Sequence, residues 1–347
     1  MVALREEGMT SGGQYKAALV GCGRIASGFA DGDGTLGIYT HAQAYQACRR
    51  TELAAVCDVD AAKAEACARR WGVPHWFVDP ARMLDAIRPD LVSVCTPDET
   101  HAPLAFSLLS SPHPPRGLLC EKPLATTVAE ARRVVALARA AGVRLGVNYI
   151  RRHLPNLRAV RDALRGGEWG AVQSVHGWYT KGVLHNGTHW FDLVRFLLGE
   201  VVRVSGRLAH DPDPADPGVD AMLELETGAC ARLTSCDSRK FTVFEMDLML
   251  EKGRLELREA ALVPRLFQAR PSARFAGYTE LLETPRDFGG SRDSLLHAVE
   301  DLADAVTAGR DPLCSGLDGV AALAVAEAAL ESARKDGRPV PPGRYEA

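Results

Sequence analysis

An apolar run that breaks abruptly into a glycine-rich turn is the feature that most constrains this chain. The run ends at Val20, and the turn after it reads Gly21, Cys22, Gly23, Arg24, Ile25 and Ala26. In this G-x-G-x-x-A pattern, Gly21 permits a tight turn, Gly23 lets the backbone approach a ligand, and the small Ala26 lets a following helix pack on the strand. The pattern predicts a strand, a turn and a helix whose first N–H groups suit the pyrophosphate of a dinucleotide. Glycines also occur in such turns for packing alone.

Strand-like and helical patterns alternate along residues 15–147. After the first strand, further strands are predicted at residues 53–57, 75–78, 91–95, 117–120 and 144–147. Helical patterns lie between them at residues 61–71, 81–87, 102–109 and 128–141. Such alternation predicts an α/β fold with a doubly wound parallel sheet that is covered on both faces. Ligands of these sheets bind outside the carboxyl ends of the strands, so the residues just after each strand are candidates for binding.

Asp58 stands directly after the second predicted strand. A carboxylate at this position accepts hydrogen bonds from the ribose hydroxyls of a dinucleotide and repels a 2′-phosphate, which favours NAD over NADP. The spacing from Gly23 to Asp58 is 35 residues, longer than the usual figure of about 20. A Gly- and Asp-rich segment at residues 27–40 supplies the excess, either as an inserted loop near the phosphates or as a solvated loop without a role. The alternative for Asp58 is an ordinary turn aspartate.

Three later motifs follow predicted strands or begin a predicted helix. They are Thr96-Pro97 with His101 four residues on, Glu121-Lys122-Pro123, and Gly187-Thr188-His189-Trp190-Phe191-Asp192. Together with the glycine turn and Asp58, they resemble the motifs of the Gfo/Idh/MocA family of NAD(P)-dependent oxidoreductases. The resemblance starts at residue 16 and extends through residues 316–340, which look like the closing helix of that family.

The resemblance implies a bound NAD, with NADP less expected because of Asp58. It implies cofactor contacts for Gly21, Gly23, Arg24, Ile25, Ala26, Asp58, Thr96, Pro97, His101, Glu121, Lys122 and Asn148. Lys122 takes the place of the family's catalytic lysine, whose ammonium stabilises a developing alkoxide or relays a proton. Glu121 is expected to hold Lys122 in place, and a cis peptide bond before Pro123 is expected to fix the direction of the lysine.

The composition changes after Asn148, and this change predicts a domain boundary. We expect a flexible tail at residues 1–14, a dinucleotide-binding Rossmann domain at residues 15–148, and a C-terminal α+β domain at residues 149–347 for substrate binding and oligomerisation. The final helices, at residues 291–336, are expected to pack back toward the first domain.

Segments of period two run through the second domain at residues 221–225, 231–233 and 244–250, with no helix between them. This pattern predicts a largely antiparallel, open-faced sheet with one packed and one free face. The family resemblance implies that such a sheet forms the interface of a homodimer or homotetramer.

A polar cluster precedes an apolar helix in the second domain. Capping by Asn186 or Thr188 would place His189 in the first helical turn, where the positive end of the dipole favours neutral imidazole. Asp192, three residues on, would lie on the same face and orient that ring. His189 is therefore the candidate general base. The family usually has Asp or Asn four residues earlier, where this chain has His185, so either histidine remains a candidate for taking the proton.

Substrate contacts are expected from Lys122, Arg151, Lys181, His185, Asn186 and His189. A phosphate or another polar substituent would meet Arg151, Arg152, Lys181 and His185, or these are ordinary surface or structural charges. The resemblance implies oxidation of a CH–OH group in a sugar, aminosugar, nucleotide sugar or cyclitol ring, with the C-3 hydroxyl as the specific guess. The alternatives are an NAD-dependent glycoside hydrolase of the same family and a non-catalytic NAD-binding regulator.

Composition argues against several other classes of partner. A formal net charge of -3 gives no electrostatic reason to expect nucleic acid or an anionic membrane. No apolar run reaches the roughly 18 residues that span a bilayer, and the first residues lack the apolar region of a signal peptide, so we expect a cytoplasmic protein. Nine cysteines without a C-x-x-C spacing predict reduced core thiols, with neither disulfides nor a metal site.

Overall fold

The computed structural model describes residues 13–31, 37–209 and 215–343. Within them the chain divides into two compact units. The first unit includes residues 13–153 and Arg292–Val320, and the second includes Leu154–Ser291 and the residues that follow Val320. Residues 1–12 of the expected tail and residues 32–36 of the expected insertion lie outside the described ranges.

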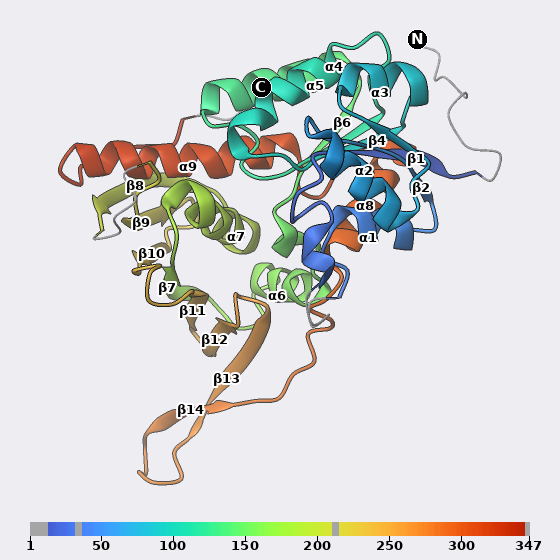
Figure 1. Cartoon of the computed structure of the whole chain (residues 1–347). Coiled ribbons are helices and arrows are strands. Elements are labelled where there is room, and N and C mark those ends of the chain that lie inside the picture. Colours follow the sequence, from blue (N-terminus) through green and yellow to red (C-terminus); the bar gives the residue numbers. More distant parts are fainter. Residues whose placement is uncertain (1–12, 32–36, 210–214, 344–347) are drawn as a thin grey trace. The chain divides into compact units, whose positions relative to one another are not determined.

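A six-stranded parallel sheet forms the centre of the first unit (Figure 1). Its strands are β1 (Tyr15–Val20), β2 (Thr51–Cys57), β3 (His75–Phe77), β4 (Leu91–Val94), β5 (Gly117–Cys120) and β6 (Arg144–Val147). They lie in the order β3-β2-β1-β4-β5-β6, and every neighbouring pair is parallel. In this order the direction of winding reverses between β1 and β4, which is the place where doubly wound folds bind their ligands. The predicted fold class of this part of the chain is confirmed.

Helices cover both faces of this sheet. They are α1 (His41–Ala47), α2 (Ala61–Trp71), α3 (Pro80–Ile87), α4 (His101–Leu109), α5 (Val128–Ala140) and α8 (Ser294–Ala308). On one face, residues of α1, α2 and α8 share a single apolar core with β1 and β2. On the other, α4 contacts both α3 and α5. The helix α8 belongs to the first unit although it follows the whole of the second sheet in sequence.

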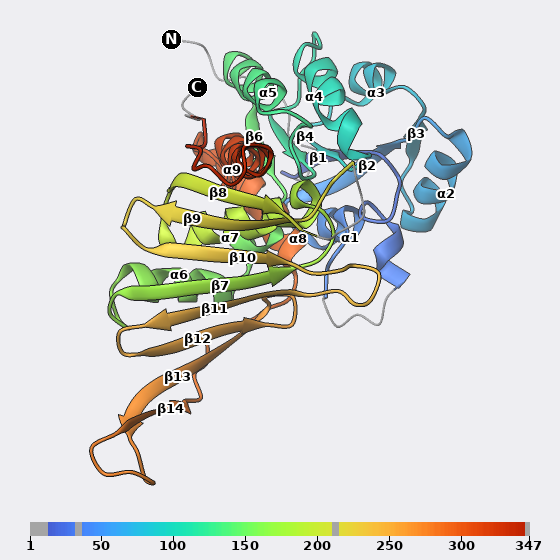
Figure 2. The same ribbon diagram turned by 90° about the vertical axis from the view of Figure 1, so that its left-hand side faces the viewer.

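An eight-stranded sheet forms the second unit (Figure 2). Its strands are β7 (Val172–Tyr179), β8 (Val201–Leu208), β9 (Val219–Leu225), β10 (Cys230–Ser235), β11 (Phe244–Leu250), β12 (Gly253–Arg258), β13 (Val263–Pro271) and β14 (Thr279–Glu283). Their order is β14-β13-β12-β11-β7-β10-β9-β8, and all pairs are antiparallel except β7 with β10. Buried and accessible residues alternate along β9 and β11, so the predicted sheet with one packed face is confirmed.

Two helices, α6 (Pro155–Arg165) and α7 (Thr188–Leu198), lie behind this sheet in Figure 2. Trp190 of α7 packs directly on Gly177 of β7, where an added Cβ atom would meet the indole Nε1 at 1.9 Å. Only a residue without a side chain permits this approach of helix to strand. The close packing fixes the start of α7, which carries His189, against the middle of the sheet.

The boundary between the units falls after His153 rather than after Asn148. Residues Ile150–His153 form a short 3-10 helix, η3, which contacts α8 of the first unit. Arg152 in η3 also forms an ion pair with Asp318 at 3.0 Å. The long helix α9 (Gly316–Arg334) begins in the first unit, and its residues after Val320 belong to the second.

Two further observations concern the chain as a whole. Each of the nine cysteines has a free thiol. Among the residues that the structure describes, no helix is both long and apolar enough to cross a membrane.

Candidate functional site

The glycine turn lies at the carboxyl end of β1, and its two glycines have different roles. Gly21 has φ +93°, and a Cβ atom there would lie 2.7 Å from the carbonyl oxygen of Cys95. The turn therefore packs tightly on the end of β4. A Cβ atom on Gly23 would instead have no atom within 4 Å. Gly23 thus presents bare backbone to open space, which is what a bound phosphate requires.

The chain after the turn departs from the expected regular helix. A hydrogen-bonded turn at residues 24–27 leads into a short 3-10 helix, η1 (Gly28–Asp31). Regular helix resumes only at His41, where Thr40 and Gln43 form a capping box. The inserted segment also returns to the core through Ile38, whose N–H donates to the Asp293 carboxylate at 2.7 Å.

Asp58 connects the end of β2 to the glycine turn. Its Oδ2 atom accepts a hydrogen bond from the Cys22 N–H at 2.8 Å, and its Oδ1 atom accepts one from the Asp60 N–H at 3.0 Å. Each carboxylate oxygen has two lone pairs, so both oxygens retain an acceptor position for a ribose hydroxyl. The predicted role of Asp58 toward a cofactor is thus compatible with a second role in shaping the turn.

His101 joins the loops that follow β4 and β5. Its Nε2 atom lies 2.7 Å from the Thr96 carbonyl oxygen, and its Nδ1 atom lies 2.6 Å from the Pro123 carbonyl oxygen. The side chain is completely buried. Because both ring nitrogens are engaged with backbone oxygens, we expect His101 to act on a cofactor through the position of Thr96, Pro97 and Pro123.

Glu121 and Asn148 form the centre of the candidate site at the ends of β5 and β6. The Nδ2 atom of Asn148 donates to Glu121 Oε1 at 2.6 Å, and the Lys122 N–H donates to Glu121 Oε2 at 3.4 Å. The Lys122–Pro123 peptide bond is cis, as predicted. Burial acts to raise the pKa of Glu121, but hydrogen bonds from His41 and Asn148 and the charge of Lys122 hold that pKa below its usual value. Glu121 is therefore a buried carboxylate that directly precedes Lys122.

Asn148 offers a test of whether a cofactor fits this edge of the sheet. Its Oδ1 atom is buried and has no hydrogen-bond partner among the described residues. A buried acceptor without a partner is unfavourable unless a ligand or water supplies a donor. The orphaned oxygen and the open space at Gly23 both suit a dinucleotide lying along the carboxyl ends of the strands.

Three residues of this region escaped the sequence analysis. His41 contacts Glu121 Oε1 through Nε2 at 2.9 Å, and Ser93 Oγ through Nδ1 at 3.0 Å. The Tyr45 hydroxyl lies 2.8 Å from the same Ser93 Oγ. A signal was available, since Ser93 is a lone polar residue within the apolar strand β4. A polar residue in a buried strand requires a partner, which a search for polar residues on neighbouring helices could have supplied.

The histidine cluster of the second unit has a different local structure from the one predicted. A single π-helical turn, η4 (Val183–Gly187), runs directly into α7. Neither predicted cap forms: Asn186 donates to the Thr180 carbonyl at 2.7 Å, and Thr188 donates to the Leu184 carbonyl at 2.8 Å. The prediction failed because the helical structure starts five residues earlier, at Val183.

Asp216 supplies the missing cap. Its carboxylate accepts hydrogen bonds from the Leu184 N–H at 2.7 Å and the His185 N–H at 2.9 Å. His189 therefore lies beyond the first turn of the combined helix, and the dipole argument for its neutral form no longer applies. Asp216 belongs to a segment whose sequence indicates only a loop, so no local signal marked it as a cap.

The remaining predicted residues are dispersed around this segment. His185 and Lys181 are exposed, Asn186 and His189 are partly buried, and Asp192 is completely buried. His189 makes an edge-to-face contact with Phe244, with ring centroids 6.3 Å apart. Arg151 is buried in η3 of the first unit, where its charge opposes the rise that burial causes in the pKa of Tyr39. It therefore belongs with the first unit rather than with the histidine cluster.

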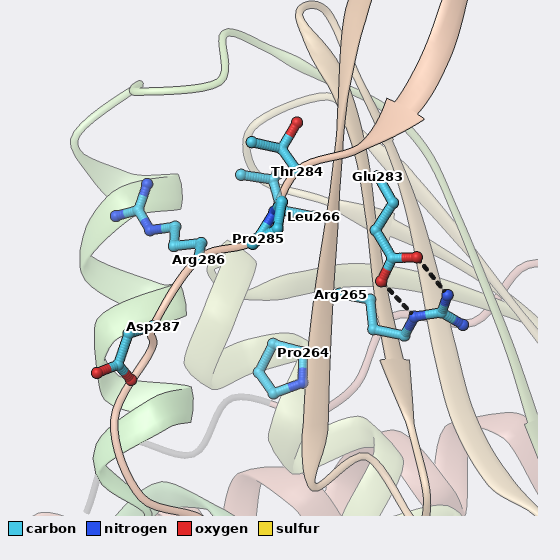
Figure 3. Close-up of a pocket in the computed structure, with 8 residues that line it drawn as sticks. All are labelled: Pro264, Arg265, Leu266, Glu283, Thr284, Pro285, Arg286 and Asp287. Carbon is cyan, nitrogen blue, oxygen red and sulfur yellow. Dashed lines mark hydrogen bonds and ion pairs between the residues drawn. The ribbon is translucent and has the colours of Figure 1, made fainter.

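A surface pocket of about 450 Å³ lies elsewhere in the second unit (Figure 3). It is lined by Pro264, Arg265, Leu266, Glu283, Thr284, Pro285, Arg286 and Asp287. Figure 3 shows Arg265 and Glu283 as a two-pronged ion pair, with Nε and one terminal nitrogen donating at 2.9 and 2.6 Å. None of the lining residues belongs to the sequence motifs, and we do not place the chemistry there.

Comparison with known proteins identifies the family of the chain. Residues 15–149 match the Gfo/Idh/MocA description "Oxidoreductase family, NAD-binding Rossmann fold". Residues 169–341 match the description of the C-terminal alpha/beta domain of the same oxidoreductase family. The two matches together span most of the chain.

Individual relatives act on sugars and cyclitols according to their names. Inositol 2-dehydrogenase 1 of Saccharopolyspora erythraea is 32% identical over 310 residues, which are 82% of this chain and 87% of that protein. D-glucoside 3-dehydrogenase of Escherichia coli is 28% identical over 204 residues, which are 55% of this chain and only 54% of that protein. A solved structure of levoglucosan dehydrogenase with NADH and L-sorbose has a TM-score of 0.78 at 18% identity and covers 95% of this chain and 99% of its own. At that identity the structure shows a common fold.

Proposed function

The chain belongs to the Gfo/Idh/MocA oxidoreductase family, and from that premise we propose that it is an NAD-dependent dehydrogenase that oxidises a ring hydroxyl of a sugar or cyclitol to a ketone. One observation carries the proposal: Glu121, a buried carboxylate held by Asn148, directly precedes Lys122 at the carboxyl end of β5. That end belongs to the same sheet edge as the glycine turn.

The residues that would hold NAD are the glycine turn, Asp58, the Thr96-Pro97 loop and Asn148. When bound, NAD accepts the hydride from the carbon that carries the hydroxyl. Asp58 would accept hydrogen bonds from ribose hydroxyls and disfavour a 2′-phosphate. The Asn148 side chain, with Nδ2 engaged by Glu121, would offer its free Oδ1 acceptor to the ligand.

Proton transfer is proposed for Lys122 together with His189. The hydroxyl proton must leave as the hydride departs, and a positioned ammonium stabilises the alkoxide that develops. His189 is the proposed proton acceptor, and Asp192 the residue that orients it. His185 is the second candidate for the proton, because it lies in the π-turn that leads into the same helix.

The position of the hydroxyl and the substituents of the substrate are the finer part of the proposal. We propose the C-3 hydroxyl, which the name of the Escherichia coli relative supports. Lys181, His185 and Asn186 would contact the polar substituents of the sugar, since they lie on one segment of the second unit. Arg151 stays a proposed substrate contact from η3.

The test is a panel assay. Purified protein is incubated with NAD and with free, phosphorylated, nucleotide-linked and amino-substituted sugars and cyclitols, and the absorbance of NADH and the product mass are followed together. We expect steady NADH formation with loss of two hydrogens from one class of compound. Cofactor binding without reduction across the panel would favour a regulator, and bond cleavage without net NADH would favour the glycoside hydrolase.

Variants then separate the proposed roles. Lys122→Met should lower kcat on the order of 100- to 10,000-fold, because it removes the group that stabilises or moves the proton. His189→Asn and His185→Asn, compared side by side, identify the proton acceptor as the variant with the larger loss in kcat. The Kd for NAD should change little in either histidine variant, and a loss of NAD binding there would contradict the assignment.

A further inference from the structure

We propose that His41 is a positioning residue for the reaction proposed above. With Ser93 and Tyr45 it forms a buried chain of hydrogen bonds that fixes the Glu121 carboxylate and, through it, the start of the Lys122 segment. The inference rests on the proposed function for its kinetic consequence, whereas the hydrogen-bond chain itself can be tested without a substrate.

This chain of hydrogen bonds joins three elements of the first unit. His41 and Tyr45 lie one turn apart on α1, Ser93 lies in β4, and Glu121 follows β5. The contacts are 2.8 Å from Tyr45 to Ser93, 3.0 Å from Ser93 to His41, and 2.9 Å from His41 to Glu121. His41, Ser93 and Tyr45 each have a relative exposure of 0%. No solvent-exposed group intervenes along the path.

The chemistry of the groups gives the chain a direction. The Glu121 carboxylate can only accept, so the Nε2 atom of His41 must carry a proton and donate. In a neutral imidazole Nδ1 accepts from the Ser93 hydroxyl, and in an imidazolium Nδ1–H donates to the Ser93 oxygen. The Ser93 oxygen in turn accepts from the Tyr45 hydroxyl, which keeps its proton because burial raises the pKa of this phenol. In both protonation states of the ring, Nε2 carries the proton that is donated to Glu121.

This chain of hydrogen bonds does more than satisfy polar groups in the core, because it ends at the Glu121 carboxylate beside Lys122. Glu121 Oε1 receives both its donors from this region, one from His41 and one from Asn148. A buried carboxylate that loses a donor reorients or gains a proton, because an uncompensated charge is costly in the interior. Asn148 holds the orphaned Oδ1 acceptor and the Lys122 N–H contacts Oε2, so a displaced carboxylate would move both neighbours.

The position of the imidazole is itself well determined. His41 is the first residue of α1 and lies inside the capping box, between the N-cap Thr40 and Gln43. In that box the Thr40 N–H donates to Gln43 Oε1 at 3.2 Å, and the Gln43 N–H donates to Thr40 Oγ1 at 3.3 Å. The cap fixes where the helix begins, and therefore where the ring enters the core.

The kinetic test compares His41→Leu with His41→Gln. Leucine fills a similar volume but cannot donate, whereas the glutamine amide retains an N–H that reaches toward Glu121. With the compound that the panel identifies, we expect His41→Leu to lower kcat on the order of 10- to 100-fold, because misplaced groups lose rate steeply. KM for the sugar and Kd for NAD should change by less than about threefold, and His41→Gln should recover most of kcat.

His75→Leu is the matched control, since His75 is an exposed histidine of β3 outside the network. It should leave kcat unchanged. Unchanged kcat in a folded His41→Leu protein would overturn the proposal. Equal losses of kcat in His41→Leu and His41→Gln, with equal falls in Tm, would also overturn it, because that pattern marks a residue that only stabilises the core.

A spectroscopic measurement needs no substrate. In protein labelled with 15N-histidine, the ring of His41 should show a proton on Nε2, assigned by the signal that His41→Gln removes. Glu121→Gln should shift this signal and leave that of His75 in place. An Nε2 atom without a proton would overturn the proposed chain of hydrogen bonds. If no panel compound is oxidised, the proposed function fails, and the tautomer still decides whether His41 fixes Glu121.

Discussion

At the scale of single residues, Asp58 combines a structural and a proposed binding role. It accepts the Cys22 N–H within the glycine turn and the Asp60 N–H beyond β2. Replacement by a small apolar residue would therefore change the turn as well as the charge. Asparagine is the informative substitution, because its amide oxygen retains one acceptor while the negative charge is removed.

We predict that Asp58→Asn weakens NAD binding about tenfold and reduces the preference of the protein for NAD over NADP. Hydrogen bonds to a charged group contribute about 1.5 to 3 kcal/mol, and asparagine retains part of this interaction. Titrations of both cofactors by tryptophan fluorescence provide the measurement, with thermal unfolding as the control for the turn. An unchanged ratio of the two dissociation constants would show that Asp58 does not contact the ribose hydroxyls.

Glu121 should give the protein a measurable pH dependence of stability. Its pKa in the folded protein lies below the ordinary value of 4.5, so its stabilising contribution is fully present above that value. The contribution is lost as the pH falls below 4.5 toward the lower folded pKa.

We therefore predict that Glu121→Gln is less stable than the natural protein at pH 7, and that the difference shrinks as the pH falls below the ordinary carboxyl pKa. Urea unfolding at pH 7, 5 and about 4 measures the difference directly. Glu99→Gln, at an exposed carboxylate of the η2 helix (Asp98–Thr100), serves as the comparison. A difference that stays constant over this range would contradict the ionised state of Glu121.

At the scale of elements, the start of α7 depends on contacts from two other segments. Asp216 caps the π-turn that leads into the helix, and Gly177 of β7 admits the Trp190 indole. The histidine cluster is thus positioned by a loop and a strand that are both distant from it in sequence.

Gly177→Ala should destabilise the second unit, because the new methyl group would collide with Trp190. Overpacking of this kind costs about 1 to 3 kcal/mol. Chemical denaturation followed by tryptophan fluorescence measures the loss. Gly290→Ala is the matched control, since a Cβ atom there would have no atom within 4 Å. If Gly177→Ala lowers the free energy of unfolding no more than Gly290→Ala does, α7 accommodates the methyl group without an energetic cost.

At the scale of the whole molecule, the free face of the eight-stranded sheet is a candidate interface between copies of the protein. Met222 of β9 and Met249 of β11 are exposed there, and each alternates with buried neighbours. The same face carries ion pairs, such as Arg258 with Glu256 at 2.9 Å. Methionine and arginine are enriched in protein interfaces, so their presence on this face is compatible with a surface that another copy covers.

We predict that the protein forms a homodimer or homotetramer through this face. Sedimentation velocity at micromolar concentration should show the oligomer, and the double variant Met222→Glu with Met249→Glu should shift it to monomer, because it places new charges in the interface. Leu282→Glu, at an exposed leucine of the edge strand β14, should leave the oligomer intact. A monomeric natural protein would refute the prediction.

Local sequence patterns were sufficient for the order of elements and for the family. The run ending at Val20, the glycine turn, Asp58 and the Glu121-Lys122-Pro123 motif each depend on a few adjacent residues. Alternating strands and helices imply a parallel sheet, because a parallel connection needs a crossover helix. The period of two in the second domain implies a sheet with one packed face for equally local reasons, since side chains alternate along a strand.

Tertiary structure alone decided which distant residues meet. His41 reaches Glu121 across 80 positions of sequence, and the Asp216 cap contacts His185 across 31. The boundary moved to His153 because η3 packs on α8, a helix that comes from the far end of the chain. Buried polar groups and helix ends need partners, but those partners need not be neighbours in sequence, so folding chooses them.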